Sequence, residues 1–439
     1  MSKNQLDYIV QPGGKVTGKL QVPGDKSISH RSIMFGALAE GTTTVTGFLQ
    51  GEDALATLQA FRDMGVKIEG PENGRVVIHG VGLHGLQAPK KPLDLGNSGT
   101  AMRLMAGLLA GQLFDSELTG DESLSARPMR RVTEPLALMG AKIQTANGGT
   151  PPLRIVGAQS LRGIHYPMPM ASAQVKSCLL LAGLYAEGET VITEPGVTRD
   201  HTERMLMGFG YPIQRDGKTV CLQGGGKLNA SHIDVPADIS SAAFFMVAAS
   251  IAPGSDICLQ NVGVNPTRIG VLSLLRLMGA DIGFANKHLS GGEDIADINV
   301  RYAGLTGIEI PEEQVPLAID EFPVLFIAAA AAKGRTVLRG AEELRVKESD
   351  RIQVMAEGLQ ALGVSATPTA DGMIIDGGHI QSGVVDSYGD HRIAMAFAIA
   401  GLVAKGPITI RNCANVATSF PRFVGLAKKA GISLEEKTR

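Results

Sequence analysis

One pattern of apolar and polar positions recurs six times along the chain. Each copy begins with a stretch of helical length that is apolar on almost every side, followed by a Gly-marked turn and a short β-branched stretch. A second helical stretch has spaced apolar positions and a polar face, and it ends in a step to Gly. The clearest copy is SISHRSIMFGALAEGTTTVTGF from residue 27, continued by DALATLQAFRDMGVKI. The other copies begin about seventy residues apart, as expected of an internal repeat, near Ser98, Ser172, Ser240, Asp320 and Asp390.

This pattern predicts an α/β fold with two similar domains of three repeats each. A stretch that is apolar all round predicts a helix buried in the centre of a domain, and the second stretch predicts an amphipathic helix. Segments such as TVTGF, TVLRG and ITIRN are β-branched or alternating, which fits small sheets packed outside the buried helices.

The domain boundaries follow from two extended, Pro-containing stretches that lead into helices, VPGDKSISH and IDVPADISS. We place the chain crossings near residues 22 and 238. The prediction is therefore a discontinuous domain of residues 1–22 and 238–439, which holds repeats four to six, and an inserted domain of residues 23–237, which holds repeats one to three.

Composition excludes several classes of function. A chain of 439 residues with 44% hydrophobic and 19% charged residues is long enough for two or three globular domains. A net charge of -2, 4% aromatic residues and no Trp argue against bulk nucleic-acid binding. The four cysteines lack metal-ligand spacing and are expected to be buried, reduced thiols. The N-terminus lacks the apolar core of a signal peptide, so we expect a soluble, cytoplasmic protein.

The first repeat places a cation where a helix disfavours one. Lys26 stands at the expected first turn, although the free N–H groups and the macrodipole already make that end positive. An unpaired cation there should destabilise the free protein slightly, and an external anion is the expected compensation. Ser27 and Arg31 form an i,i+4 pair that could complete a phosphate or carboxylate site. The alternative is that Ser27 only caps the helix and Arg31 only extends along its surface.

The second and third repeats offer polar groups at the equivalent place. Gly99 in GNSGTAMR would let the backbone approach a ligand, with Thr100 as a candidate cap. Arg127 precedes a Pro in DESLSARPMRR, which favours an extended or turn backbone, and a solvated basic strip is the alternative. Ser172 and Gln174 stand at the start of SAQVK, where a plain N-cap explains the serine alone.

The last repeats contribute acids as well as bases. Asp320 and Glu321 open an apolar helix, where capping alone could account for them. The segment LRVKESDRI is expected to be helical, with Lys347 and Arg351 on one face, and a surface ion-pair helix is the alternative. DHR at 390–392 again places charges at a helix start.

All these groups occupy the same position in their repeats. Stacked repeats bring equivalent helix ends to one side, so we expect a single surface that binds a small polyanionic molecule. Asp320 and Glu348 are the carboxylates expected to transfer protons there. The cations expected on that surface are Lys26, Arg31, Arg127, Lys347, Arg351 and Arg392.

Seven motifs together resemble the 5-enolpyruvylshikimate-3-phosphate synthase family, in the family's order and over essentially the full length. They are PGDKSISHR, GNSGTAMR, ARPM, SAQVKS, DEFP, RVKESDR and GDHR. The resemblance implies two inside-out α/β domains. It also implies transfer of the enolpyruvyl group of phosphoenolpyruvate to the 5-hydroxyl of 3-phosphoshikimate, with release of phosphate, in chorismate and aromatic amino acid biosynthesis. No metal, organic cofactor, nucleic acid or membrane partner is implied, and we expect a monomer.

The resemblance also implies residue roles. Asp320 would accept the proton of the 5-hydroxyl, Glu348 would protonate the methylene carbon, and Lys26 would contact both substrates. The residues implied to bind 3-phosphoshikimate are Lys26, Ser27, Arg31, Ser172, Ala173, Gln174, Arg199, Asp320 and Lys347. Those implied to bind phosphoenolpyruvate are Lys26, Gly99, Arg127, Gln174, Arg351 and Arg392.

Two other functions stay open at this point. A UDP-N-acetylglucosamine enolpyruvyl transferase would share the fold, but that family has Lys-Asn at the position of Lys26-Ser27 and a loop cysteine, which residues 114–122 lack. A non-catalytic ligand-binding protein could use the same repeats. Glyphosate sensitivity is not decided either: Thr418 resembles the less sensitive branch of the family, whereas Gly99 is retained where its most resistant members carry a methyl group.

Overall fold

The computed structural model describes residues 6–290 and 292–438, and the chain divides into two compact units. Unit 1 comprises Met1–Pro23, Pro236–His288 and Asp294–Arg439, and unit 2 comprises Gly24–Val235 and Leu289–Glu293. Residues 289–293 thus belong to unit 2, whereas the sequence analysis expected them in the domain of residues 238–439. The reason is a local contact: His201 Nδ1 lies 2.8 Å from Glu293 Oε1, and both side chains are buried.

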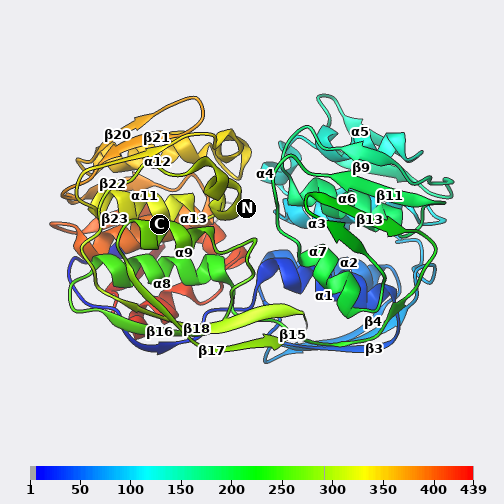
Figure 1. The fold of residues 1–439 in the computed structure, drawn as a ribbon, viewed down its shortest axis with the longest axis horizontal. Helices are drawn as coiled ribbons and strands as arrows, with labels where there is room; N and C mark the ends of the chain where they lie inside the picture. Colours follow the sequence, from blue (N-terminus) through cyan, green and yellow to red (C-terminus); the bar gives the residue numbers. More distant parts are fainter. Residues whose placement is uncertain (1–5, 291, 439) are drawn as a thin grey trace. The chain divides into compact units, whose positions relative to one another are not determined.

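Unit 2 is built around three buried helices, which come from the apolar stretches of the first three repeats (Figure 1). They pack closely where small residues meet. A Cβ atom on Gly107 would lie 2.0 Å from the carbonyl oxygen of Cys178, so only glycine allows this approach of two helices. The buried helices are α1 (Lys26–Leu38), α3 (Gly99–Ala110) and α6 (Ala173–Gly183).

Three small sheets of unit 2 have the strand orders β14-β3-β5-β4 with β15 beside β3, β6-β7-β9-β8, and β10-β11-β13-β12. Alternation explains their burial: in β13, Val220 and Leu222 are buried while their neighbours in the strand are not. The strands are β3 (Ala39–Thr46), β4 (Lys67–Glu72), β5 (Arg75–Val81), β6 (Leu93–Asp94), β7 (Ser116–Thr119), β8 (Lys142–Ala146), β9 (Thr150–Val156), β10 (His165–Pro167), β11 (Glu189–Thr193), β12 (Gln214–Asp216), β13 (Thr219–Gln223), β14 (Leu228–Asn229) and β15 (His232–Asp234). The remaining helices are α2 (Glu52–Asp63), α4 (Glu122–Ser125), α5 (Arg130–Leu138) and α7 (His201–Gly208).

Unit 1 repeats this design around the buried helices α8 (Ile239–Ile251), α11 (Phe322–Ala331) and α13 (His391–Ala400). All 13 residues of α8 are buried, as its apolar sequence predicts. The other helices are α9 (Gly270–Leu277), α10 (Val315–Ala318), α12 (Arg351–Ala361), α14 (Phe423–Ala430) and the 3-10 turns η1 (Glu312–Gln314), η2 (Glu342–Val346), η3 (Gly401–Val403) and η4 (Cys413–Thr418).

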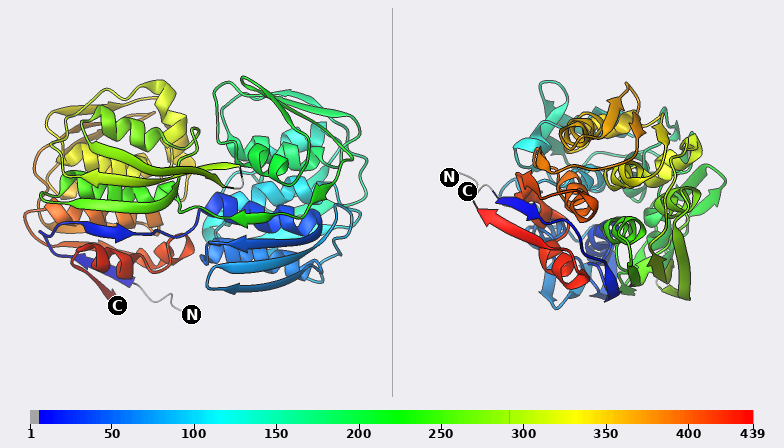
Figure 2. Two further views of the ribbon diagram at one scale, coloured as in Figure 1. Left: turned by 60° about the horizontal axis from the view of Figure 1, so that its bottom comes forward. Right: turned by 90° about the vertical axis from the view of Figure 1, so that its left-hand side faces the viewer.

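The sheets of unit 1 have the orders β22-β23-β1-β24, β17-β18-β16-β2 and β19-β21-β20. The first sheet joins the two ends of the chain, because β1 pairs antiparallel with β24 from Leu6↔Thr438 to Val10↔Leu434 (Figure 2). The strands are β1 (Leu6–Val10), β2 (Thr17–Leu20), β16 (Asp256–Gly263), β17 (Asp281–Ser290), β18 (Glu293–Arg301), β19 (Arg335–Leu338), β20 (Ser365–Pro368), β21 (Met373–Asp376), β22 (Gly383–Asp386), β23 (Ile408–Arg411) and β24 (Leu434–Thr438). The predicted fold class, two α/β units with buried helices and outer sheets, is confirmed.

The expectation of four buried thiols is half right. Cys178 and Cys413 are buried, but Cys221 and Cys258 are only partly buried, because each occupies a strand position between two buried neighbours. All four are free. Among residues 6–290 and 292–438, no helix has the length and apolar character needed to cross a membrane.

Candidate active site

The first predicted residue, Lys26, opens α1 as expected, but Asp25 caps the helix. Asp25 Oδ1 accepts a hydrogen bond of 2.8 Å from the backbone N–H of Ile28, so Ser27 is not the cap. Lys26 Nζ lies 3.0 Å from Asp53 Oδ2 of α2, and its side chain is 20% exposed. A carboxylate of the protein therefore already offsets the cation that the sequence analysis left to an external anion.

Arg31 is buried in unit 2, which rules out the alternative that it only extends along the helix surface. Its Nε donates to Thr202 Oγ1 at 2.7 Å, one Nη to the Ser27 carbonyl at 2.9 Å, and the other Nη to Ser177 Oγ at 2.9 Å. Burial lowers the pKa of Arg31 to about 10, and the carboxylate of Glu203 acts against this shift. Because a guanidinium has five N–H groups, one N–H remains on each Nη for a ligand.

The starts of α3 and α6 are joined through Gln174. Its Oε1 accepts from Arg103 Nη1 at 2.5 Å, and its Nε2 donates to Thr100 Oγ1 at 3.0 Å. The expected cap of α3 is wrong: Ser98 Oγ, not Thr100, accepts from the backbone N–H of Ala101 at 3.1 Å. Thr100 instead orients Gln174.

Gly99 lies beside two guanidinium groups. A Cβ atom on Gly99 would be 3.0 Å from Arg127 Nη1 and 3.3 Å from Arg103 Nη1. Arg127 is held by Asn97 Oδ1, which accepts from its Nη2 at 2.7 Å, and by Ser123 Oγ at 3.3 Å. The absent side chain of Gly99 thus leaves room for both cations at the start of α3.

The other residues predicted in unit 2 lie at the start of α6 and in the loop before α7. Ser172 caps α6, because its Oγ accepts from the N–H of Val175 at 3.4 Å, and Ala173 is the first helical residue. Arg199 is close enough to Arg31 to contribute to lowering the pKa of Arg31. The repeat starts of unit 2 therefore bring cations to helix N-termini at which a side chain caps one backbone N–H and others remain, which is an arrangement suited to anions.

In unit 1, Asp320 is the centre of a second cluster. Its Oδ1 lies 3.5 Å from Lys347 Nζ and 3.6 Å from Arg351 Nη1, and its carbonyl accepts from Arg392 Nη1 at 2.9 Å. The capping alternative fails, because α11 begins at Phe322 and its N-cap, Glu321, makes no side-chain cap bond. Asp320 therefore takes part in side-chain interactions with cations.

Arg351 is surrounded by carboxylates and is only 1% exposed. Its Nε donates to Asp390 Oδ2 at 2.8 Å and its Nη2 to Glu348 Oε2 at 2.6 Å. Burial acts to lower the pKa of Arg351, but the charges of Asp390, Glu348 and Asp320 outweigh burial and raise it. Its Nη1 is buried and has no hydrogen-bond partner among the described residues, which points to a ligand.

The predicted helix through LRVKESDRI is wrong. Lys347 ends the 3-10 turn η2 in an extended conformation, and α12 begins only at Arg351. Asp350 explains the break, because its Oδ1 caps α12 by accepting from the N–H of Gln353 at 3.0 Å. Lys347 and Arg351 meet through Asp320 and not through a shared helix face.

The sequence analysis missed several partners in the site. In unit 1, Glu321, which the sequence offered with Asp320 at a helix start, is buried and lies 3.6 Å from Arg392 and 4.0 Å from Arg268, and Ser240 Oγ donates to it. Arg268, in NPTRIG, is nearly fully buried, and one isolated arginine carries no local signal of that burial. Others found only in the structure are Asp53, Asn97, Arg103, Ser177, Thr202 and the positioning role of Asp390.

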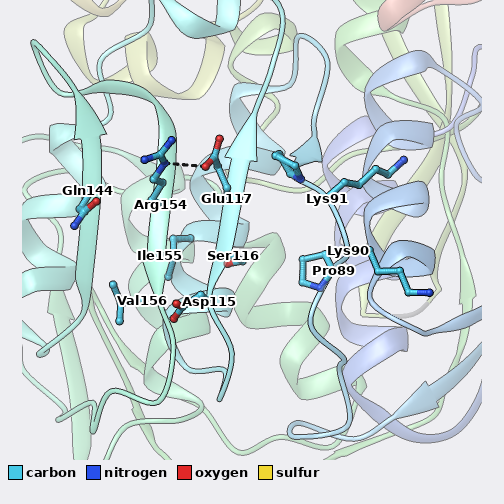
Figure 3. A pocket seen from close by; sticks show the side chains of 11 residues that line it. Pro89, Lys90, Lys91, Asp115, Ser116, Glu117, Gln144, Arg154, Ile155 and Val156 are labelled. Carbon is cyan, nitrogen blue, oxygen red and sulfur yellow. Dashed lines mark hydrogen bonds and ion pairs between the residues drawn. The ribbon is translucent and has the colours of Figure 1, made fainter.

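A cavity of 500 Å³ in unit 2 contains none of the predicted site residues (Figure 3). It is lined by the segment 89–92 and by strands β7, β8 and β9, and the ion pair of Arg154 Nε with Glu117 Oε2 at 2.8 Å lies in it. Within the part of the chain that the structure describes, no group of three or more His, Cys, Asp or Glu side chains could hold a metal ion.

The two clusters offer complementary chemistry. The cluster of unit 2 sets guanidinium groups beside helix N-termini and suits an anion, while that of unit 1 combines several carboxylates with several cations and suits proton transfer. The expectation that all these residues share one surface stays a prediction.

Comparison with known proteins gives the family. The family model of EPSP synthase (3-phosphoshikimate 1-carboxyvinyltransferase) matches residues 10–426. A 3-phosphoshikimate 1-carboxyvinyltransferase from Nitrosococcus oceani is 67% identical over 434 residues, which are 99% of this chain and 98% of that protein. The solved EPSP synthase of Acinetobacter baumannii is 61% identical, with a TM-score of 0.89, over 99% of this chain and 100% of that one. The enolpyruvyl transferase NikO of Streptomyces tendae, 16% identical with a TM-score of 0.78 over 100% of both chains, shares the fold alone. The chain belongs to the EPSP synthase family.

Proposed function

We propose that the chain transfers the enolpyruvyl group of phosphoenolpyruvate to the 5-hydroxyl of 3-phosphoshikimate, in chorismate and aromatic amino acid biosynthesis. The observation that carries this function is the buried Nη1 of Arg351, a donor without a hydrogen-bond partner beside Asp320. A donor of this kind is the expected partner of a substrate carboxylate or phosphate. Membership of the EPSP synthase family supports the same reaction.

Binding of 3-phosphoshikimate is assigned to the helix starts of α1 and α6. Each Nη of Arg31 keeps one N–H beyond its bond to Ser27 or Ser177, and these two donors suit an anionic group of the substrate. The cap of α6 and the amide of Gln174 add polar groups of fixed orientation. The full set proposed for this substrate is Lys26, Ser27, Arg31, Ser172, Ala173, Gln174, Arg199, Asp320 and Lys347.

Binding of phosphoenolpyruvate is assigned to guanidinium groups. Arg127 and Arg351 are held rigidly by neighbouring side chains, so they lose little entropy when an anion binds. Gly99 supports this role, because a side chain there would crowd Arg127. The full set proposed for phosphoenolpyruvate is Lys26, Gly99, Arg127, Gln174, Arg351 and Arg392.

Asp320 and Glu348 carry the proton transfers in this proposal. Asp320 accepts the proton of the 5-hydroxyl while the hydroxyl oxygen forms a bond to C2 of phosphoenolpyruvate. Lys347, 3.5 Å from Asp320, stabilises the negative charge that develops on the hydroxyl oxygen. Glu348 donates a proton to the methylene carbon, which gives a tetrahedral intermediate. Glu348 then takes back a proton from the methyl group, the C2–O bond to phosphate breaks, and the double bond forms again. The proton that Asp320 took from the 5-hydroxyl passes to the leaving phosphate oxygen, which restores both carboxyl groups to their starting states. Arg351 orients Glu348 through the 2.6 Å contact.

Titration calorimetry with 3-phosphoshikimate, followed by an assay of phosphate release with phosphoenolpyruvate, tests this function. We expect saturable binding of 3-phosphoshikimate, and phosphate release only when both substrates are present. Binding of UDP-N-acetylglucosamine instead would favour the other enolpyruvyl transfer, and binding without turnover would favour a non-catalytic protein. Ser27 in place of Asn, and the lack of Cys in residues 114–122, argue against the first of these.

We also propose that the enzyme is a monomer in the cytoplasm, with these two small molecules as its partners. Its net charge of -2, without a basic excess, supports small molecules over nucleic acid as partners. Light scattering after size-exclusion chromatography should give the mass of one chain, 46.0 kDa. A dimer mass would contradict the monomer and leave the reaction assignment untouched.

A further inference from the structure

A buried cluster of charges in unit 2 takes no part in the proposed chemistry. Lys176 of α6 is fully buried, and its Nζ lies 3.1 Å from both carboxylate oxygens of Glu194 and 2.6 Å from Glu203 Oε1. Arg215 is partly exposed and lies 3.6 Å from Glu194 and 3.5 Å from Glu203. Burying one ammonium and two carboxylates is costly even when they are paired, so a specific role for the cluster is a reasonable hypothesis.

The two carboxylates stand at the two ends of one loop. Glu194 directly follows strand β11, and Glu203 belongs to the first turn of α7. Between them, residues 194–200 include Arg199, and the hydroxyl of Thr198 donates back to Glu194. A single ammonium on α6 therefore holds both ends of the loop that presents Arg199.

The cluster is also directly adjacent in sequence to the groups that hold Arg31. Ser177 follows Lys176 on α6, and Thr202 precedes Glu203 on α7. Arg31 donates to both hydroxyls, at 2.9 and 2.7 Å, and Thr202 donates to Ser177 at 2.7 Å. Hydrogen bonds weaken steeply beyond about 3.2 Å, so a shift of α7 relative to α6 by a few tenths of an ångström would change the orientation of Arg31.

We propose that Lys176 is a positioning residue for the binding of 3-phosphoshikimate, because its ion pairs with Glu194 and Glu203 fix α7 and the Arg199 loop on α6. It does not contact the substrate, since its ammonium is enclosed by the two carboxylates. It acts through Arg31, which donates to Ser177 of α6 and Thr202 of α7, and through the loop that contains Arg199. This inference rests on the proposed function.

Lys176→Met tests the role with a side chain of similar volume and no charge. The two buried carboxylates then lose their shared ammonium and keep Arg215 as their nearby cation, at 3.6 and 3.5 Å. Losing a cation in a buried site favours the protonated form of a carboxyl, so repulsion between the two carboxylates in the variant, and with it the defect, should grow as pH rises. Relative to the unchanged protein at each pH, we expect the Kd of 3-phosphoshikimate to rise about twofold at pH 6 and about tenfold or more at pH 8.5, while kcat at saturation changes by less than about threefold.

Glu203→Gln separates positioning from simple electrostatics. This variant leaves Lys176 paired with Glu194 but removes the link to α7. It also removes a negative charge near Arg31, so electrostatics alone predicts tighter binding of an anion. We expect weaker binding instead, by about threefold to tenfold, because α7 is no longer held on α6. Lys227→Met is the matched control, since Lys227 forms an exposed pair with Glu40 in the same unit, and it should leave Kd unchanged.

The proposal is overturned if folded Lys176→Met binds 3-phosphoshikimate within twofold of the unchanged protein at every pH. It is also overturned if Glu203→Gln binds as tightly or more tightly, or if kcat falls in either variant while Kd stays constant. If Lys176→Met does not fold, Glu203→Gln decides the question alone. Failure of the unchanged protein to bind 3-phosphoshikimate would refute the proposed function, which is a different result.

Discussion

The repeat starts of the two units carry similar cations but surround them with different partners. In unit 2, Arg31 donates to two hydroxyls and a carbonyl, which are neutral. In unit 1, Arg351 donates to two carboxylates and Arg392 lies 3.6 Å from a third, that of Glu321. Neutral acceptors orient a cation without cancelling its charge, whereas carboxylates orient it and neutralise it.

This difference divides the chemistry between the units. Cations with neutral partners retain a positive potential that attracts an anionic substrate. Cations among carboxylates make a nearly neutral group that can accept and return protons without a large change in net charge. Lys26 is the exception in unit 2, because it pairs with Asp53. One repeated architecture thus supports both recognition and acid–base chemistry, according to the acceptors beside each helix start.

Glu348→Gln gives the largest expected effect and tests the acid–base role of unit 1. Without a proton to donate, turnover should fall by about 10² to 10⁴, the range typical of general acid–base catalysis. Both substrates should still bind, and exchange of the methylene hydrogens with deuterated water should slow in parallel, as measured by NMR. Glu343→Gln is the control. Glu343 is a carboxylate of the same cluster, 3.5 Å from Lys347, and it has no proposed role in the reaction. Unchanged exchange in Glu348→Gln would identify another acid.

Lys26→Met tests the exception in unit 2. We expect activity to fall by about 10² or more, because the variant loses the charge that is proposed to contact both anionic substrates. The sequence alone predicted equal or higher stability for this variant. The contact with Asp53, which is 7% exposed, reverses that expectation to a loss of about 1–3 kcal/mol, since a buried carboxylate is left without its cation. Turnover and denaturant unfolding, measured on one preparation, give both effects. If the variant is as stable as the unchanged protein, the ion pair of Lys26 with Asp53 does not contribute to the free energy of unfolding.

His30, on α1 of unit 2 between Lys26 and Arg31, should make the stability of the protein depend on pH. Burial, together with Lys26 and Arg31, lowers the pKa of His30 to about 3, and its ring nitrogens lie 2.8 Å from Thr57 Oγ1 and 3.4 Å from Ser98 Oγ. The unfolded chain takes up a proton near pH 6.5 and the folded protein does not, so this contribution to stability is complete above that pH and is lost as pH falls toward 3. Between pH 7.5 and 5.5 the loss should be about 1.4 kcal/mol.

The matching variant for that prediction is His30→Gln, which keeps polar contacts but cannot titrate. Its free energy of unfolding should change less than that of the unchanged protein between the same two pH values, by the same 1.4 kcal/mol or so. Equal pH dependence of the two proteins would mean that His30 is protonated in the folded state.

Gly99→Ala gives the smallest expected effect. The new Cβ would lie 3.0 and 3.3 Å from flexible guanidinium ends, so Arg127 and Arg103 need to move by only a few tenths of an ångström. We expect KM for phosphoenolpyruvate to rise severalfold, with the Kd of 3-phosphoshikimate and the melting temperature unchanged. A larger rise for 3-phosphoshikimate than for phosphoenolpyruvate would contradict the assignment of Gly99 and Arg127.

The sequence by itself determined the repeated architecture and the family. Apolar residues on all sides of a helical stretch have no stable place except a core, so α8 and its counterparts were predictable from local pattern. The helix starts at Lys26 and at His391 could also be predicted from neighbouring residues, because capping depends on residues within one turn. The motifs at these starts were specific enough to indicate the family.

Only the tertiary structure decided which partner each charge meets. The pairs of Arg31 with Thr202, of Lys176 with Glu203 and of Arg351 with Asp390 join residues on different helices, and no spacing in the sequence encodes them. The break before α12 was also missed, because the i,i+4 spacing of Lys347 and Arg351 suggested one continuous helix, whereas Asp350 caps a new helix that begins at Arg351. Local patterns follow from the chain's own geometry, but a polar group buried by packing takes whatever acceptor the fold brings within about 3 Å.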